Sequence, residues 1–294
     1  MKRSFFLTVL IVMVVVSSVR ADWPNYLGPN KNAISDEKGL LRSWPASGPK
    51  VLWQKDLGAG FGGVAVSKGR LYGTDQIVMI TATSRREKGG RSAPAGGWDG
   101  RPDDGVDGVV LGMSVEDGST LWTYKGWQSR IPIPNVAAIG DGRLFISGGY
   151  MAGSAMILVE KGGDKYVVDE LYTTQDFGTH VHPPVIYKGH LYGHCTTNSR
   201  RDGMSCMSID GELKWKTERS PVFDKGGFIL VDDLILSVDG TEGILYLIEP
   251  SPDGFKKLAS VDLLDTKDCW GPLALSDGKL LIRDQKQMKC VAVR

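Results

Sequence analysis

The chain has 294 residues, 38 of them glycine, and a formal net charge of +1 at pH 7. This near-neutral balance excludes a general electrostatic attraction to nucleic acid or to anionic membranes, and the glycines follow no collagen period. A chain of this length forms one large domain or two ordinary ones, and its many glycines indicate short strands joined by tight turns.

Residues 1–21 have the pattern of a secretory signal peptide. Lys2 and Arg3 give a positive n-region, an apolar run follows over 5–16, and small residues lead up to Ala21. The run is shorter than the about 20 apolar residues that cross a bilayer, and no cysteine near the cleavage site could carry a lipid anchor. We expect a periplasmic or secreted protein that is soluble after cleavage and has no membrane span.

A hairpin pattern then recurs five times along the chain. Each copy joins a short apolar stretch to an aliphatic-aromatic strand, and the copies occupy 62–74, 135–147, 183–194, 226–238 and 271–283. Two-residue pairs of the kind that favour type I′ turns connect the strands, at Lys68-Gly69, Asp141-Gly142, Lys188-Gly189 and Asp277-Gly278, with Asp232-Asp233 as a weaker fifth copy. The turns are 73, 47, 44 and 45 residues apart. A period near 45 is typical of a four-stranded propeller blade.

A second pair of strands follows the hairpins. It is expected in 111–125, 205–218 and 245–262, and more loosely in 156–174. The long first spacing has a visible cause, because residues 84–108 are rich in Gly, Arg, Asp and Pro and lack apolar periodicity. We interpret them as a loop insertion between the second and third strands of the first blade, solvated or partly disordered.

The last unit offers three strands before the chain ends, near 271–275, 279–283 and 289–293. The missing fourth strand is predicted to come from residues 51–57 (VLWQKDL), pairing with 289–294, which would cover two strand edges and close the ring. The prediction is therefore an all-β fold: a small β-propeller of about five four-stranded blades over 51–294, closed by an N-terminal strand. A β-sandwich would not require a fixed period. Residues 22–50 are predicted to form an ordered segment packed on the outside.

Two segments carry a family resemblance. SVEDGSTLW (114–122) and SIDGELKW (208–215) resemble the end of the repeat in pyrroloquinoline-quinone-like (PQQ-like) β-propeller proteins, and 22–30 and 43–53 are similar to the start of secreted members. The resemblance covers essentially the whole mature chain and implies the propeller fold more than any function. It implies two functional branches: quinoprotein alcohol dehydrogenases, with eight blades, a Cys-Cys pair and calcium, and lipid-anchored scaffolds of outer-membrane assembly. This chain has about five blades, no Cys-Cys pair and no anchor cysteine.

The four histidines and four cysteines are the residues best suited to metal binding or disulfide formation. A two-residue turn at Lys188-Gly189 would pair 187 with 190 and 182 with 195, which leaves His180, His182 and Cys195 as a three-ligand metal set; ordinary polar residues near a blade rim are the alternative. The cysteines permit bridges 195–206 and 269–290 or simple burial. No G-x-S-x-G nucleophile motif is present.

We expect a binding or scaffold protein without catalysis of its own, whose partner is a polar small ligand or an envelope protein. No cofactor is expected; PQQ with calcium belongs to the alternative, a PQQ-dependent alcohol dehydrogenase-type oxidoreductase. In a propeller, the loops that precede each first strand and the loops between second and third strands share one face. The ligand-binding residues predicted there are His180, His182, Asn198, Arg200, Arg201, Asp202, Asp224, Lys225, Trp270, Arg283 and Asp284. Rim loops are also polar simply because they meet water.

Overall fold

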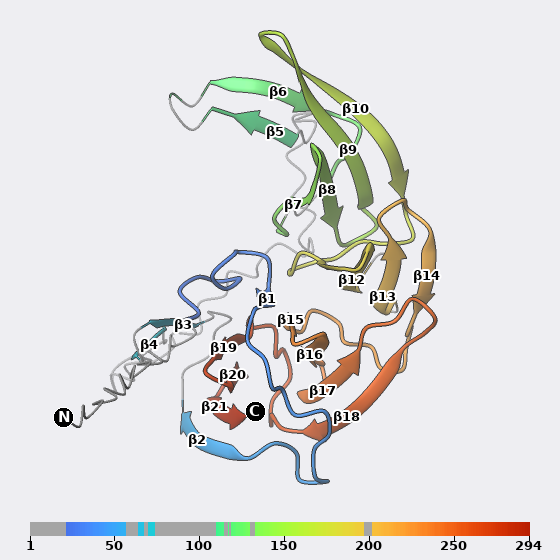
Figure 1. Cartoon of the computed structure of the whole chain (residues 1–294). Coiled ribbons are helices and arrows are strands. Elements are labelled where there is room, and N and C mark those ends of the chain that lie inside the picture. Colours follow the sequence, from blue (N-terminus) through green and yellow to red (C-terminus); the bar gives the residue numbers. More distant parts are fainter. Residues whose placement is uncertain are drawn as a thin grey trace, which may run out of the picture.

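The computed structural model describes residues 22–56, 64–67, 70–73, 110–114, 117, 119–129, 133–196 and 202–294. These residues form strands, bridges and turns and contain no helix, so none of them forms a helix that could cross a membrane. The strands make small sheets that follow one another around an arc (Figure 1). The predicted signal peptide (1–21) and loop insertion (84–108) lie outside the described residues.

Three sheets each contain a run of four consecutive antiparallel strands, and the third also includes the short strand β1 (Ile34–Ser35). The first holds β7 (Ala137–Gly140), β8 (Arg143–Gly148), β9 (Gly153–Gly162) and β10 (Lys165–Thr174). The second holds β11 (Val185–Tyr187), β12 (His190–Cys195), β13 (Gly203–Ser208) and β14 (Leu213–Lys216). The third holds β15 (Phe228–Val231), β16 (Leu234–Val238), β17 (Ile244–Glu249) and β18 (Lys256–Asp262). These strands coincide with the repeats found in the sequence, so the predicted four-stranded units are confirmed.

The hairpin turns have the backbone that the sequence predicted. Both central residues have positive φ at Asp141-Gly142 (53° and 77°), Lys188-Gly189 (46° and 75°) and Asp277-Gly278 (52° and 67°), which is the type I′ pattern. Asp232-Asp233 adopts the same turn with φ of 50° and 61°, although neither residue is glycine. Lys68-Gly69 lies outside the described residues.

A strand from the N-terminal part of the chain completes the last sheet, as predicted. Its order is β19 (Ala274–Ser276), β20 (Lys279–Arg283), β21 (Gln287–Ala292) and β2 (Val51–Asp56). β2 runs antiparallel to β21, with Trp53 opposite Cys290 and Gln54 opposite Lys289. The donated strand gives the backbone groups along β21 partners that a three-stranded sheet would leave without.

The predicted first blade is divided into two hairpins. β3 (Val64–Ser67) pairs with β4 (Arg70–Gly73), and β5 (Val110–Met113) pairs with β6 (Thr120–Tyr124), in two separate two-stranded sheets. Among the described residues no hydrogen bond joins β4 to β5, so the five-bladed closed ring is not seen there. The sequence between these two strands includes the low-complexity insertion, which gives no apolar pattern to fix their pairing.

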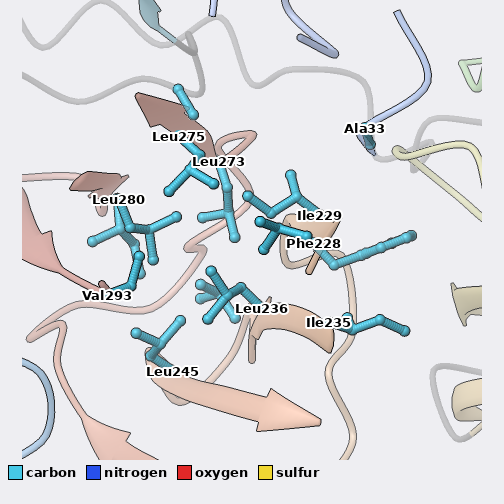
Figure 2. Close-up of a cluster of buried hydrophobic side chains, with 14 of the residues drawn as sticks. Ala33, Phe228, Ile229, Ile235, Leu236, Leu245, Leu273, Leu275, Leu280 and Val293 are labelled. Atoms are coloured by element: carbon cyan, nitrogen blue, oxygen red, sulfur yellow. The ribbon is translucent and has the colours of Figure 1, made fainter. Parts of the chain in front are cut away.

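In the third and last sheets, burial decreases toward the fourth strand. In the third sheet the first three strands are almost fully buried, whereas β18 alternates between half-buried and exposed residues. Leu236 and Leu245 from this sheet meet Leu273, Leu280 and Val293 from the last sheet, each at most 2% exposed, in the largest apolar cluster (Figure 2). Sheets that pack face to face in this way bury both faces of their inner strands.

Residues 22–42 form an N-terminal segment that runs along the first strands of the sheets. Trp23 bridges to Val66 of β3, and β1 (Ile34–Ser35) runs parallel to β15, the first strand of its sheet. The segment occupies this edge because unpaired backbone groups of first strands are available there. Gly28 is needed for the path: its φ is +81°, and a Cβ would come within 2.7 Å of the Trp23 ring.

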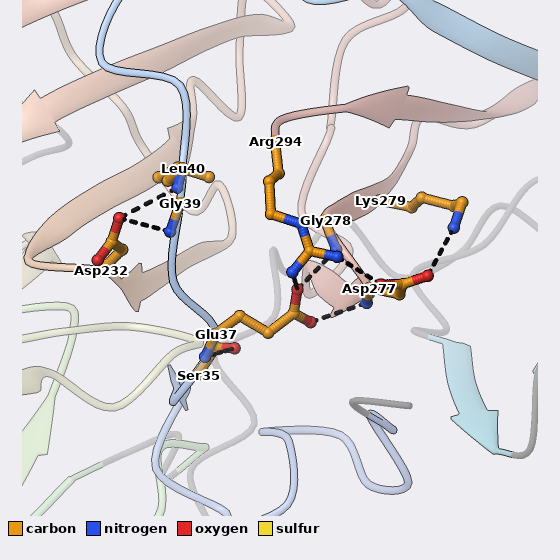
Figure 3. A network of polar contacts seen from close by, with 9 residues as sticks. All are labelled: Ser35, Glu37, Gly39, Leu40, Asp232, Asp277, Gly278, Lys279 and Arg294. Atoms are coloured by element: carbon orange, nitrogen blue, oxygen red, sulfur yellow. Dashed lines mark hydrogen bonds and ion pairs between the residues drawn. The ribbon is translucent and has the colours of Figure 1, made fainter. Parts of the chain in front are cut away.

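Hairpin turns of two sheets hold this segment in place (Figure 3). Asp232 accepts hydrogen bonds from the backbone N–H groups of Gly39 and Leu40, both at 3.0 Å. Glu37 accepts from the N–H groups of Asp277 (2.9 Å) and Gly278 (2.6 Å) and lies 3.7 Å from Arg294. At one turn the acidic side chain is therefore in the turn (Asp232), and at the other it comes from the segment (Glu37) and accepts from the turn backbone.

Candidate binding site on the loop face

Two sets of loops meet on one side of the sheets, here called the loop face: the leading loops, which precede a first strand, and the loops between second and third strands. Phe223 in the leading loop of β15 donates its N–H to Asp239 Oδ2 (3.0 Å) in the β16–β17 loop. In the last sheet, Asp265 and Thr266 donate to Asp284 Oδ2 at 3.0 and 3.2 Å. In each of these two units, an acidic side chain in the loop between the second and third strands therefore bonds the backbone of the leading loop.

Four predicted site residues form a compact cluster on this face. Lys225 Nζ lies 4.3 Å from the centre of the Trp270 ring and 3.3 Å from Asp224 Oδ1. His182 contacts the carbonyl oxygen of Trp270 through Nε2 at 3.2 Å. Lys225, Asp224 and His182 are each at most 6% exposed. The buried ammonium is thus stabilised by an ion pair and by the face of an indole ring.

Tyr26, from the N-terminal segment, covers His182. Its ring stacks on the imidazole with centres 6.0 Å apart and planes 11° from parallel, and its hydroxyl lies 3.2 Å from Nδ1. Because the Trp270 carbonyl can only accept, Nε2–H is the donor, so Nδ1 accepts from the tyrosine hydroxyl. Burial lowers the pKa of His182 to about 4, so the ring is neutral at pH 7. Tyr26 itself is 45% exposed.

His194 belongs to the same buried region, although the sequence did not single it out as a site residue. Nδ1–H donates to the carbonyl of Gly226 and Nε2 accepts from Ser237 Oγ, both at 2.8 Å. The ring packs on Phe223 and Phe228 at 4.7 and 4.6 Å. Burial, together with the neighbouring His182, lowers its pKa to about 3. Its position in the second strand of a repeat, HLYGHC (190–195), was the sequence signal that could have identified it.

His180 lies under the β8–β9 loop. It is 4% exposed, and the Tyr150 ring packs edge-on against it at 4.2 Å. Tyr150 and Met151 both have positive φ, 54° and 66°, and are 46% and 72% exposed. Two left-handed non-glycine residues in a row are strained, and this loop therefore holds two large side chains out toward solvent.

The remaining described site residues have other roles. Asp202 pairs with Lys216 of β14 at 3.2 Å. Arg283 is 5% exposed and its Nε donates to the backbone oxygen of Asp284 at 3.1 Å. Although burial raises the pKa of Asp284, N–H donors including Lys286 and Gln287 outweigh it and leave the pKa below its usual value. We assign Asp284 to loop structure because its two oxygens are already engaged by these donors. Asn198, Arg200 and Arg201 lie outside the described residues.

The predicted metal set of His180, His182 and Cys195 is not brought together. The predicted pairing of residue 187 with residue 190 is confirmed. The predicted pairing of residue 182 with residue 195 is wrong, because Cys195 instead bridges to Thr179 and its sulfur accepts a hydrogen bond from the N–H of Gly178. Among the described side chains, no three of the types His, Cys, Asp and Glu are placed to hold a metal ion.

Neither of the two possible disulfides, 195–206 and 269–290, forms in the structure. All four cysteines are free and buried, and in the β12–β13 pair Cys206 stands opposite Tyr192 while Cys195 stands opposite Gly203. Burial raises the pKa of the Cys195 and Cys269 thiols to about 12. Thiols of this kind stay protonated and are poor nucleophiles.

Comparisons with known proteins give little to add. No family model and no curated protein matches the chain. A chain from a crystal structure of the mitotic checkpoint complex is similar with a TM-score of 0.40 and 12% identity, over 99% of both chains. A chain from the S. cerevisiae complex of Dbp5 with Nup159, Gle1, IP6 and ADP is similar with a TM-score of 0.34 and 11% identity, over 85% of this chain and 62% of that one. Likenesses this weak say nothing about what the chain binds.

Proposed function

We propose that the chain is an exported binding or scaffold protein, a five-bladed propeller of the PQQ-like repeat type without catalysis of its own, that holds a protein partner on its loop face. The observation that carries this proposal is a set of three exposed large side chains, Tyr26, Tyr150 and Met151. Tyr26 packs on the buried His182, and Tyr150, next to Met151 in the chain, packs on the buried His180.

The distribution of exposure on this face favours a protein partner over a small polar ligand. The polar groups that the sequence suggested as ligand contacts, such as Lys225 and Asp224, are buried and engaged with each other. Among the large side chains that do reach solvent are Tyr26, Tyr150 and Met151, which offer aromatic and thioether surface. Tyrosine and methionine are enriched at protein interfaces, and residues held rigidly in a strained loop lose little conformational freedom on binding.

The five-bladed ring is supported by the neighbours of the two hairpins of the divided blade. β3 contacts β19, the first strand of the last sheet, and β6 contacts β10, the fourth strand of the next sheet. These are the contacts that the first and fourth strands of one intervening blade would make. We therefore infer that β4 pairs with β5 to complete that blade. Amide hydrogen exchange tests this: slow exchange along both strands is expected, and fast exchange along either contradicts it.

Site-specific photocrosslinking in the native host tests the partner site. A benzophenone side chain placed at position 26 or 150 should give a discrete crosslinked product. The matched control is position 171, where Leu171 is equally exposed (47%) but lies on β10. A product from positions 26 and 150 and none from 171 supports the proposal. Equal products from all three positions, or none from 26 and 150, contradicts it.

A further inference from the structure

A cleft separates the β14–β15 loop from the β17–β18 pair and is distinct from the cluster around His182. Its volume is about 470 Å³, and its walls include Arg219, Val222, Glu242, Tyr246, Phe255 and Lys257. Pockets for small organic ligands have volumes of about 300–1,000 Å³. The cleft is therefore large enough for a compact organic molecule.

One wall of the cleft is rigid. Glu218 and Phe223, on either side of Arg219 and Val222, have positive φ of 54° and 55°. Thr217 fastens the loop, because its hydroxyl donates to the Pro221 carbonyl (2.7 Å) and accepts from an N–H of β13 (2.9 Å). A loop backbone held in this conformation does not have to be ordered on binding.

The inner part of the cleft is aromatic. Phe223 is fully buried and packs against the rings of Tyr246 (4.9 Å) and Phe255 (5.9 Å). Tyr246 is 8% exposed and Phe255 is half-buried, so each ring keeps part of its surface toward the cleft. A flat apolar group can stack or pack on such rings.

The rim carries cations that no described residue neutralises. Arg219 and Lys257 are exposed and form no ion pair with any described side chain, whereas the adjacent Lys256 is paired with Glu249 at 2.7 Å. Asp239 also borders the cleft, but backbone N–H groups occupy both of its oxygens. Glu242 is the remaining rim anion. The lining thus holds two cations and two carboxylates, but Asp239 is buried and its charge is directed at backbone N–H groups. The exposed charges are then two cations and one anion, which suit a single carboxylate better than a polyanion.

We propose that this cleft binds small monocarboxylates with an aromatic body, the carboxylate lying between Arg219 and Lys257 and the ring against Tyr246 and Phe255. The site is separate from the protein-partner site proposed above, and direct binding measurements on the purified chain address it alone.

Calorimetric titration with 3-phenylpropionate tests the proposal, with neutral 3-phenylpropanol and cationic 3-phenylpropylamine as comparison ligands. The carboxylate should bind measurably and the other two more weakly. Arg219→Gln and Lys257→Gln should each weaken binding about three- to tenfold, since each removes one charge-assisted contact at a partly solvated rim. Glu242→Gln should tighten binding about two- to threefold, because it removes the repulsive charge.

Lys256→Gln is the matched control, because it removes a lysine one residue away whose charge is already paired. It should leave the affinity for 3-phenylpropionate unchanged, and near-ultraviolet circular dichroism should show all variants folded. The proposal is wrong if the alcohol binds as tightly as the carboxylate or if the control variant weakens binding as much as Lys257→Gln does. It is also wrong if the carboxylate does not bind at millimolar concentration.

Discussion

Acidification from pH 7 to pH 5 should destabilise this protein through two buried histidines. His182 and His194 have pKa values of about 4 and about 3 in the fold, against about 6.5 for an exposed histidine. Below pH 6.5 the unfolded chain takes up a proton at each position, whereas the folded chain keeps both rings neutral. Their contribution to stability is thus complete above pH 6.5 and is lost as the pH falls toward the folded pKa values.

The magnitude follows from the pH interval. One pKa unit corresponds to about 1.4 kcal/mol, and each histidine is still neutral in the fold at pH 5. Each should therefore reduce the free energy of unfolding by about 2 kcal/mol between pH 7 and pH 5, about 4 kcal/mol together. This is a large part of the about 5–15 kcal/mol by which folded domains are stable. Most carboxylates titrate below this interval.

Urea unfolding at pH 7 and pH 5 measures the effect. His182→Gln and His194→Gln should each lower stability at pH 7 but reduce the difference between the two pH values by about 2 kcal/mol. His190→Gln is the control, because His190 is half-buried at the end of β12 and bonds only the Lys188 carbonyl in the described contacts; it should leave the difference unchanged. A wild-type difference below about 1 kcal/mol, or full retention of it in both variants, would refute this reasoning.

Three further outcomes are expected. Trp53→Cys should form a disulfide with Cys290 on mild oxidation, because the two residues face each other in the β2–β21 ladder. The control Gln54→Cys should form none, because position 54 lies opposite Lys289. Mass spectrometry detects the disulfide, and equal disulfide formation in both variants would contradict the register. Asp233→Gly should stabilise the fold by about 0.5–1 kcal/mol, because glycine adopts the φ of 61° without strain. Loss of the hydrogen bond from the Tyr187 hydroxyl reduces this gain. Thermal unfolding measures the net change, and a fall in stability would contradict the prediction. Leu245→Ala should lower the free energy of unfolding by about 2–5 kcal/mol, because Leu245 is fully buried between two sheets. Leu171→Ala, at an exposed position, is the control in chemical unfolding. Equal losses of stability in the two variants would contradict the assignment of the core.

Much of the fold could be predicted because hairpins are local. The turn pairs at Asp141-Gly142, Lys188-Gly189 and Asp277-Gly278 select positive φ by residue type alone, and the apolar residues around them alternate with the strand period. The donation of Val51–Asp56 was predictable for a related reason, since the last repeat lacked a strand and one unassigned strand remained. The pairing of β4 with β5 had no such local pattern.

The candidate site was predictable only in outline. The loops do meet on one face, because strand direction fixes which loops lie at which end. The burial of the polar loop residues could not be predicted from residue type, as Asp284 shows, because N–H donors from two loops enclose its carboxylate. The register also shifts between β11 and Thr179, which lies opposite Cys195. Two consecutive prolines separate them, and proline cannot donate a hydrogen bond to a strand partner. Tyr26 contacts His182 across 156 positions of sequence.

The sequence by itself determined the repeated strand units, their type I′ turns and the strand that completes the last sheet, because periodicity and turn chemistry depend on neighbours along the chain. Only the tertiary structure decided that the N-terminal segment runs along the first strands of the sheets and that the charged residues become buried partners of one another. It likewise decided that Tyr26, Tyr150 and Met151 are exposed. Exposure and pairing depend on which distant segments pack together, and no pattern of local residues encodes that.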